Sequence, residues 1–242
     1  MKLLKAMAIA FSIYSKIPVP QFEWKEEDME YMMCFFPWIG GVIGLFFFGW
    51  AVLCEKFAVG NVCYALIGAA IPLMISGGFH VDGYMDTMDA FHSYQSREKK
   101  LEILKDSHIG AFAAIMLALY YMIDIAAISE IHTQKAVSAL AAVFFLARCF
   151  SGIAVMTLQP AKKEGLLYTF ASSAQKVRVK AALYFQTVLC VVLMLLVSGW
   201  YGAAAIGAAL LSFFYFKKKS YKELGGITGL SLIHISEPTR HL

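Results

Sequence analysis

Long runs of apolar residues, separated by short polar segments, divide this chain of 242 residues. A run of about 20 apolar residues can cross a bilayer as a helix. The segment 3–20 is also apolar, but it contains two lysines and two prolines, so it predicts an interfacial or re-entrant helix. The pattern as a whole predicts an all-α, polytopic integral membrane protein. The predicted spans are 32–54, 61–79, 109–128, 136–158, 181–198 and 200–216.

Composition supports the membrane class. Hydrophobic residues make up 60% of the chain and charged residues 16%, with a mean hydropathy of +0.64. Soluble domains are about 45–50% apolar and about 25% charged. Residues 1–229 show no linker or low-complexity segment, so we expect a single membrane domain. Gly40 and Gly44 form a G-x-x-x-G pair in the first predicted span, which predicts a close contact with another helix.

Basic residues are distributed unevenly between the connecting segments. With a cytoplasmic N-terminus and six alternating spans, seventeen Lys and Arg residues fall in cytoplasmic segments and only Lys56 and Lys135 in outer ones. Because basic segments stay on the cytoplasmic side, this bias predicts the orientation. We therefore expect a multi-pass protein of the cell (inner) membrane whose long loops, 80–108 and 159–180, are cytoplasmic. These basic segments suit membrane lipid or an anionic substrate, and nothing indicates nucleic-acid binding.

Three aspartates in the first long loop form the most informative polar pattern. Asp82, Asp86 and Asp89 recur at helical spacing and fall within about 60° of one helix face. Neighbouring carboxylates repel each other unless a cation lies among them, and hard oxygen ligands favour Mg²⁺, Mn²⁺ or Ca²⁺ over soft metals. We therefore expect these three residues to bind a divalent metal ion, with Mg²⁺ among the candidates, at the membrane edge. The alternative is a solvated helix start, which explains Asp82 but not the repeat.

Further polar residues extend the candidate site. A glycine pair, 77–78, permits a turn before the acidic helix. Asp106 could join the metal site or, with its neighbour Ser107, cap the next helix. Arg148 falls near the middle of span 136–158, where a charge indicates either a functional role or an internal partner for Asp124. The candidates beyond the aspartates are Gly78, His80, Lys105, Asp106, Ser107, Arg148 and Lys162.

Together these segments resemble the cobalamin synthase family, the adenosylcobinamide-GDP ribazoletransferases. The family pattern G-G-x-H-x-D-G-x-x-D-x-x-D matches residues 77–89, and an I-M-K-D-S-x-x-G-like segment matches residues 103–110. Arg148 lies where the family has an arginine within the membrane. The run A-K-K-E-G at 161–165 resembles the family's A-R-x-E-G-like loop, with Lys162 in place of the usual arginine. The resemblance covers about residues 1–229.

The resemblance implies a Mg²⁺-dependent transferase of cobalamin biosynthesis. Its substrates would be adenosylcobinamide-GDP and α-ribazole or its 5′-phosphate, and its products adenosylcobalamin or its 5′-phosphate and GMP. Asp82, Asp86 and Lys105 would act in catalysis, with Asp82 either accepting a proton or only binding metal. All three aspartates would bind Mg²⁺. The resemblance leaves open whether the protein forms an oligomer. The substrate would contact Gly78, His80, Asp106, Ser107, Arg148 and Lys162.

The C-terminal residues depart from the family pattern. The run GGITG at 225–229 resembles a late G-G-x-T-G-D motif, but Leu230 stands where the family has an aspartate. We expect residues 230–242 to be a non-native tail, and one acidic residue and the last family helix to be missing.

Two other functions agree less well with the sequence than the transferase. A CDP-alcohol phosphotransferase also uses spaced aspartates at a membrane edge, but its D-G-x-x-A-R pattern is not met, because Tyr84, Met85 and Asp86 follow Gly83. A membrane transporter would carry charges along a path through the bilayer, whereas this chain concentrates its charges in segments on one side.

Overall fold

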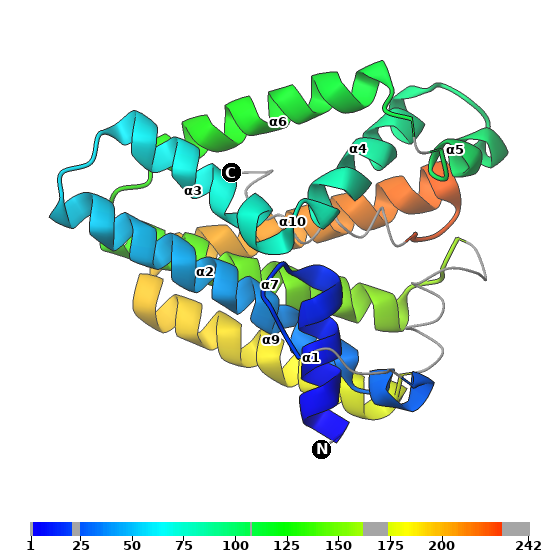
Figure 1. The fold of residues 1–242 in the computed structure, drawn as a ribbon, viewed down its shortest axis with the longest axis horizontal. Coiled ribbons are helices and arrows are strands. Elements are labelled where there is room, and N and C mark those ends of the chain that lie inside the picture. Colours follow the sequence, from blue (N-terminus) through cyan, green and yellow to red (C-terminus); the bar gives the residue numbers. More distant parts are fainter. Residues whose placement is uncertain (1, 21–24, 107, 162–173, 229–242) are drawn as a thin grey trace.

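The computed structural model describes residues 2–20, 25–106, 108–161 and 174–228, and these are mainly helical (Figure 1). The all-α prediction is confirmed. Ser107, Lys162 and the expected tail at 230–242 lie outside the described residues. In chain order the helices are α1 (Lys2–Tyr14), η1 (Glu26–Met29), α2 (Met32–Lys56), α3 (Asn61–Ser76), α4 (Phe79–His92), α5 (Arg97–Ile103), α6 (Ala111–Ser129), α7 (Gln134–Thr157), α9 (Lys176–Ser198) and α10 (Trp200–Leu224).

Helices α2 and α7 form the centre of the bundle. A Cβ atom on Gly40 would collide with the carbonyl oxygen of Phe144, and one on Gly44 with that of Ala141. The two helices therefore approach closely along the G-x-x-x-G face, which confirms that prediction. Helices α9 and α10 pack on α7, and α1 packs on α2. Helix α1 has 13 residues and is a short separate helix rather than a span, as the sequence indicates.

The predicted multi-pass architecture is confirmed, but with fewer spans. In the part of the chain that the structure describes, α2, α6, α7 and α9 are long and apolar enough to cross a membrane. Helices α3 and α4 add a fifth span only if the bent pair is counted as one. The expected span 200–216 is the first part of α10, which is not among them. Three lysines at 217–219 follow this apolar stretch, and the helix continues through them.

A sharp bend at Gly77 and Gly78 separates the second apolar segment from the acidic helix. Gly77 ends α3 with φ +69°, Gly78 precedes α4 with φ +82°, and the two helices are bent by 97°. Only glycine adopts such left-handed angles without a steric penalty. The predicted span 61–79 thus ends earlier, at Ser76, and α4 turns away from its direction.

The bundle has two contrasting ends (Figure 1). The α2–α3, α6–α7 and α9–α10 connections lie on the left in this view, and we call this the turn end. There Asn61 Nδ2 donates to the Ser129 carbonyl at 3.0 Å, and the Tyr64 hydroxyl to the Ile131 carbonyl at 2.8 Å. Helices α4 and α5 and the C-terminal part of α10 form the opposite end, which we call the aspartate end.

Candidate functional site

The three predicted metal ligands lie along α4, which is not one of the spanning helices by itself. Asp82 is exposed, and Asp86 and Asp89 are half-buried. Burial, followed by the negative charges of Asp82 and Asp89, raises the pKa of Asp86 to about 6. The predicted repulsion is thus present and affects Asp86. A cation bound beside these carboxylates would offset it.

Asp89 also has a structural role that the sequence did not reveal. Its Oδ2 accepts the backbone N–H of Gly110 at 2.6 Å, and its Oδ1 accepts that of Ala113 at 2.9 Å. These N–H groups belong to the start of α6, where no helical carbonyl can reach them. A Cβ atom on Gly110 would collide with the carboxylate. Asp89 therefore joins α4 to α6 as a capping residue, and its predicted contact with Mg²⁺ stays a prediction.

Asp106 does not supply the cap of α6. Its Oδ1 accepts the backbone N–H of His108 at 3.0 Å and lies 2.6 Å from Nδ1 of the same residue. The hydrogen bond from the His108 N–H is the largest cause that lowers the pKa of Asp106 below its usual value. Asp106 and Lys105 are both exposed, so either can meet a ligand from solution.

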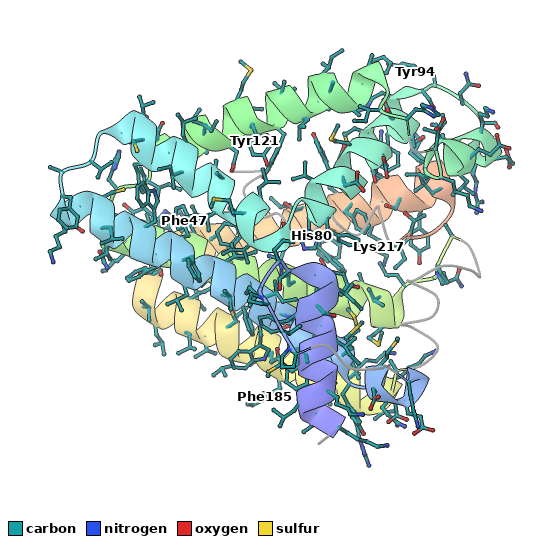
Figure 2. The ribbon with its side chains drawn as sticks, in the orientation of Figure 1. Phe47, His80, Tyr94, Tyr121, Phe185 and Lys217 are labelled. Carbon is teal, nitrogen blue, oxygen red and sulfur yellow. The ribbon has the colours of Figure 1, made fainter. Side chains whose placement is uncertain are left out.

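His80 is buried at the start of α4. It is 1% exposed, and its ring centroid lies 6.3 Å from that of Tyr14 on α1 and 6.2 Å from that of Phe36 on α2. Figure 2 shows His80 inside the molecule, where α4 begins beside α1. Its position two residues before Asp82 directs it away from the acidic face. The structure thus places His80 among aromatic rings, and its predicted substrate contact stays a prediction.

Arg148 is fully buried between α2 and α7. Its Nη1 donates to the carbonyl of Phe144 at 3.1 Å, and its side chain packs where a Cβ on Gly40 would stand. Asp124, the alternative partner, lies on α6, which packs on α3 and α4, whereas α7 packs on α2, α9 and α10. These two charges therefore belong to helices with different neighbours, and the predicted substrate contact of Arg148 stays untested.

A small apolar cluster brings the candidate segments together. Met88, Leu104 and Leu224 belong to this cluster, and Ala161 packs against it. Each of these four residues directly precedes or lies within a segment that the sequence singled out. The acidic helix thus passes through this cluster, and the Lys105 segment, the loop that contains Lys162 and the Gly-Gly run at 225–226 each start beside it. The buried members are Tyr84, Met88, Ala90, Phe91, Leu104, Tyr120 and Leu224.

Comparison with known proteins decides the family. A model described as cobalamin-5-phosphate synthase matches residues 6–230. The chain belongs to this family. The adenosylcobinamide-GDP ribazoletransferase of Lachnoclostridium phytofermentans is 44% identical over 229 residues, covering 95% of this chain and 87% of the relative. The enzyme of the same name from Geotalea daltonii is 30% identical over 237 residues, covering 97% and 93%. No solved structure matches.

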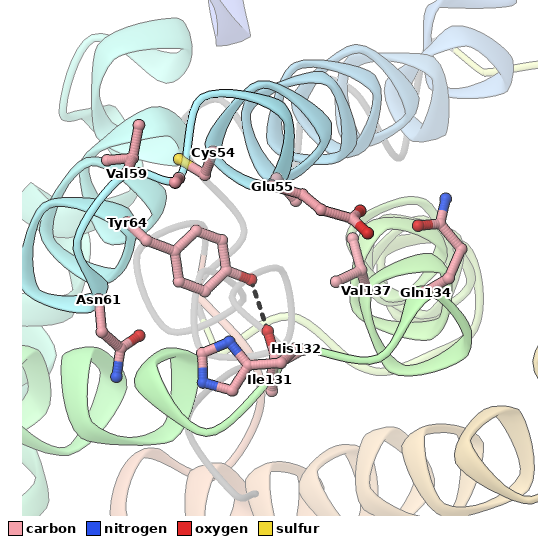
Figure 3. Close-up of a pocket in the computed structure, with 11 residues that line it drawn as sticks. Cys54, Glu55, Val59, Asn61, Tyr64, Ile131, His132, Gln134 and Val137 are labelled. Atoms are coloured by element: carbon pink, nitrogen blue, oxygen red, sulfur yellow. Dashed lines mark hydrogen bonds between the residues drawn. The ribbon is translucent and has the colours of Figure 1, made fainter.

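The acidic helix and the Lys105 segment thus lie at the aspartate end, whereas a pocket lies elsewhere. A pocket of about 300 Å³ opens at the turn end, and Glu55, Asn61, Tyr64 and His132 are among its lining residues (Figure 3). The dashed line in Figure 3 marks the hydrogen bond from Tyr64 to Ile131. None of the residues that line this pocket is among the site residues predicted from the sequence.

Whether a metal ion fits the acidic helix α4 depends on the ligand atoms that its side chains offer. Within the described ranges, no group of three or more His, Cys, Asp and Glu side chains is placed to hold one metal ion. Asp82 and Asp86 offer carboxylate oxygens on the same helix face, and both reach solvent. Mg²⁺ is commonly bound by one or two carboxylates together with water and substrate phosphates. The residues present therefore fit a shared site of that kind.

Proposed function

We propose that this protein is an adenosylcobinamide-GDP ribazoletransferase. It would transfer the cobinamide-phosphate group of adenosylcobinamide-GDP to α-ribazole or its 5′-phosphate and release GMP. One observation carries the proposal: the relative of that name from Lachnoclostridium phytofermentans is 44% identical over 95% of this chain. The convergence of the family-like segments on one apolar cluster supports it, because chemistry on a diphosphate needs charged groups from several segments.

Asp82 and Asp86 are the residues that we propose to hold Mg²⁺. When bound, the ion would neutralise charge on the substrate diphosphate during displacement. The pKa of Asp86, raised to about 6 by burial and by its two acidic neighbours, supports a cation there. Asp89 remains a candidate third ligand, since each carboxylate oxygen can accept more than the one hydrogen bond that it receives from α6.

The reaction exchanges a phosphoanhydride bond of the substrate diphosphate for a phosphoester bond. A hydroxyl oxygen of α-ribazole bonds to the phosphorus that carries cobinamide, and the bond from this phosphorus to the GMP oxygen breaks. The exposed carboxylate of Asp82 can accept the hydroxyl proton. Lys105 is exposed beside the small cluster, and its ammonium would offset the negative charge that develops on departing GMP. Lys162, outside the described residues, is proposed for the same purpose.

We place the aspartate end on the cytoplasmic side of the cell membrane. The two basic residues expected outside the cell lie at the turn end, where Lys56 is the last residue of α2 and Lys135 the second of α7 (Figure 1). The helix α5 and the C-terminal part of α10, rich in Lys and Arg, lie at the other end. This separation of charge supports the proposed orientation.

The test is a direct assay for GMP. The full chain is purified in detergent and incubated with adenosylcobinamide-GDP, α-ribazole and Mg²⁺, and products are separated by chromatography. We expect GMP and adenosylcobalamin in equal amounts, and none of either when α-ribazole is omitted. Absence of GMP, together with product from a CDP-activated lipid and an alcohol acceptor, would show that the proposed function is wrong.

A further inference from the structure

Helix α5 occupies a central place at the aspartate end although none of its residues enters the proposed reaction. It runs from Arg97 to Ile103 and packs on α4 and on α10. Ser96 caps it by accepting the backbone N–H of Lys99 at 3.4 Å. A seven-residue helix has little stability of its own, so its position depends on these tertiary contacts.

A buried ion pair fixes α5 to α10. The ammonium of Lys100 contacts the carboxylate of Glu223, and these side chains are only 9% and 14% exposed. Glu223 also lies 3.6 Å from Lys219. A buried charge is costly unless it is paired, so this contact specifies how the two helices meet. The adjacent Lys99 differs, because its side chain is 59% exposed and it contacts Glu102 within α5.

The turn that follows α10 is shaped around α5. Gly225 ends α10 with φ +72°, and a Cβ atom there would collide with the guanidinium of Arg97. Gly226 faces another segment, because its Cβ would lie 2.7 Å from the carbonyl oxygen of Gln159 and 2.8 Å from the nitrogen of Ala161. Gly226 is therefore required by close contacts with backbone atoms, and Gly225 by its left-handed backbone.

Backbone hydrogen bonds join this turn to the segment that leads into the second long loop. The N–H of Ala161 donates to the carbonyl of Ile227 at 2.7 Å, and the N–H of Ile227 donates to the carbonyl of Gln159 at 3.0 Å. The Gln159 N–H in turn donates to the hydroxyl of Tyr221 at 3.0 Å. The two segments therefore form one unit, although more than sixty positions separate them in the sequence.

The same unit is connected to the acidic helix. Leu224, fully buried, packs in the small cluster with Met88 and Phe91 of α4. The ammonium of Lys219 lies 5.5 Å from the centre of the Phe91 ring, at a distance that permits a cation–π contact. A displacement of α10 relative to α5 would therefore be transmitted to the helix that carries Asp86.

We propose that Lys100 and Arg97 are positioning residues for the transferase reaction. Through them, α5 holds the turn 225–228 against the segment 159–161, and this unit forms one wall of the reaction site beside α4. The inference rests on the proposed function, and it adds residues that neither bind the metal nor react. Lys100 acts through Glu223, and Arg97 acts through its contact with Gly225.

The experiment uses the full chain in detergent and has two readouts. Hydrogen–deuterium exchange of peptides that cover 221–228 reports whether the turn is held. The GMP assay gives kcat and KM for adenosylcobinamide-GDP. The variants are Lys100→Met, Glu223→Met and the double variant, and Lys99→Met is the matched control one position away. Arg97→Ala is a second test, because this exposed side chain can be removed without burying an unpaired charge.

We expect Lys100→Met to speed exchange at Ile227 by about tenfold and to lower kcat by about tenfold, because it leaves a buried carboxylate without its main partner. KM should stay within about threefold, which separates positioning from substrate binding. Adding Glu223→Met should change kcat by about threefold or less, because the two side chains act as a pair. Lys99→Met should behave as wild type, and Arg97→Ala should speed exchange at Gly225.

The remaining outcomes distinguish failure of the positioning role from failure of the proposed function. Unchanged exchange in both Lys100→Met and Arg97→Ala would overturn the positioning role. Faster exchange with wild-type kcat would show that the turn is not part of the reaction site, which also overturns the inference. If Lys100→Met fails to fold, Arg97→Ala decides with the same two readouts. If wild type makes no GMP, the proposed function fails, and the exchange data alone decide whether α5 holds the turn.

Discussion

The two ends of the bundle use polar residues in different ways. At the turn end, the side chains of Asn61 and Tyr64 satisfy carbonyl groups of the neighbouring connection. At the aspartate end, Asp89 joins α4 to α6, and Lys100 joins α5 to α10. There too, burial and the two neighbouring carboxylates of α4 raise the pKa of Asp86 to about 6. The polar side chains of the turn end thus satisfy backbone carbonyl groups. Those of the aspartate end include neighbouring negative charges that repel each other.

The difference between the two ends indicates which of them contains the reaction site. The turn end contains a pocket of about 300 Å³, but no predicted site residue lines it. At the aspartate end, electrostatic repulsion and the convergence of distant segments indicate the site. A carboxylate in a cleft whose pKa is shifted by burial and by neighbouring charges is a candidate for a functional role.

The largest expected effect is on turnover. Asp86→Asn should lower GMP formation by about a thousandfold, because it removes a proposed metal ligand while preserving side-chain size. The matched variant at the turn end is Glu55→Gln, which removes a pocket carboxylate and should retain wild-type turnover. Comparable losses in the two variants, or full activity of Asp86→Asn, would remove the distinction between the ends. The GMP assay measures both.

The next effect concerns the contact between α4 and α6. Asp89→Ala should lower the free energy of unfolding by about 2 kcal/mol, because the amides of Gly110 and Ala113 lose their acceptor. Asp89→Asn keeps one acceptor oxygen, so its free energy of unfolding should fall by less than that of Asp89→Ala. Thermal unfolding in detergent provides the comparison. Equal midpoints for wild type and both variants would show that this carboxylate does not stabilise α6.

The pH dependence of metal binding should reflect the raised pKa of Asp86. Protons compete with Mg²⁺ for this carboxylate, so the half-saturating Mg²⁺ concentration should rise by up to about tenfold per pH unit below about 6. It should stay nearly constant above that pH. An apparent Mg²⁺ affinity that is the same at about pH 5 and about pH 7 would contradict the assignment of Asp86 as a ligand.

The same shift predicts the stability of the metal-free protein. The pKa of Asp86 is higher in the folded chain than its ordinary value of 3.8, so the folded state binds the proton more tightly. The stabilisation from protonation is therefore complete below 3.8 and is lost as the pH rises through about 6. Thermal midpoints in EDTA should fall across this window, and Asp86→Asn should reduce that fall.

The smallest effect is expected at the turn end. Tyr64→Phe removes the hydrogen bond to the carbonyl of Ile131 and should cost about 1 kcal/mol of stability. Turnover per folded molecule should not change, because the aspartate end is untouched. Unfolding midpoints and the GMP assay on the same preparation test both statements. A loss of turnover greater than the loss of folded protein would indicate that the two ends are coupled.

Local patterns allowed much of the fold to be predicted. Apolar runs indicated the membrane class, the spacing of the aspartates indicated the helix that became Phe79–His92, and Gly40 and Gly44 indicated the close contact of α2 with α7. Each of these depends on residues within a few positions of one another. The Gly-Gly pair at 77–78 likewise indicated a turn, but its 97° bend depends on how α3 and α4 pack on α6.

The contacts that assemble the candidate site were not predictable in the same way. Asp89 and Gly110 are 21 positions apart, and nothing in either segment indicates that one caps the other's helix. Leu104 and Leu224 resemble any apolar residue in sequence, so their shared cluster becomes evident only from the fold. Capping of α6 is one of the two roles that the sequence leaves open for Asp106, yet its Oδ1 accepts the backbone N–H of His108.

The most direct test of the central claim is to locate the metal along the chain. Fe²⁺ replaces Mg²⁺ in the purified protein, ascorbate and peroxide generate radicals at the bound ion, and mass spectrometry identifies the backbone cuts. We predict cuts within α4 around Asp82 and Asp86, suppressed by excess Mg²⁺ and lost in Asp86→Asn. Mg²⁺-sensitive cuts at the turn end around Glu55 and His132, or cuts in α4 that persist in Asp86→Asn, would contradict the account.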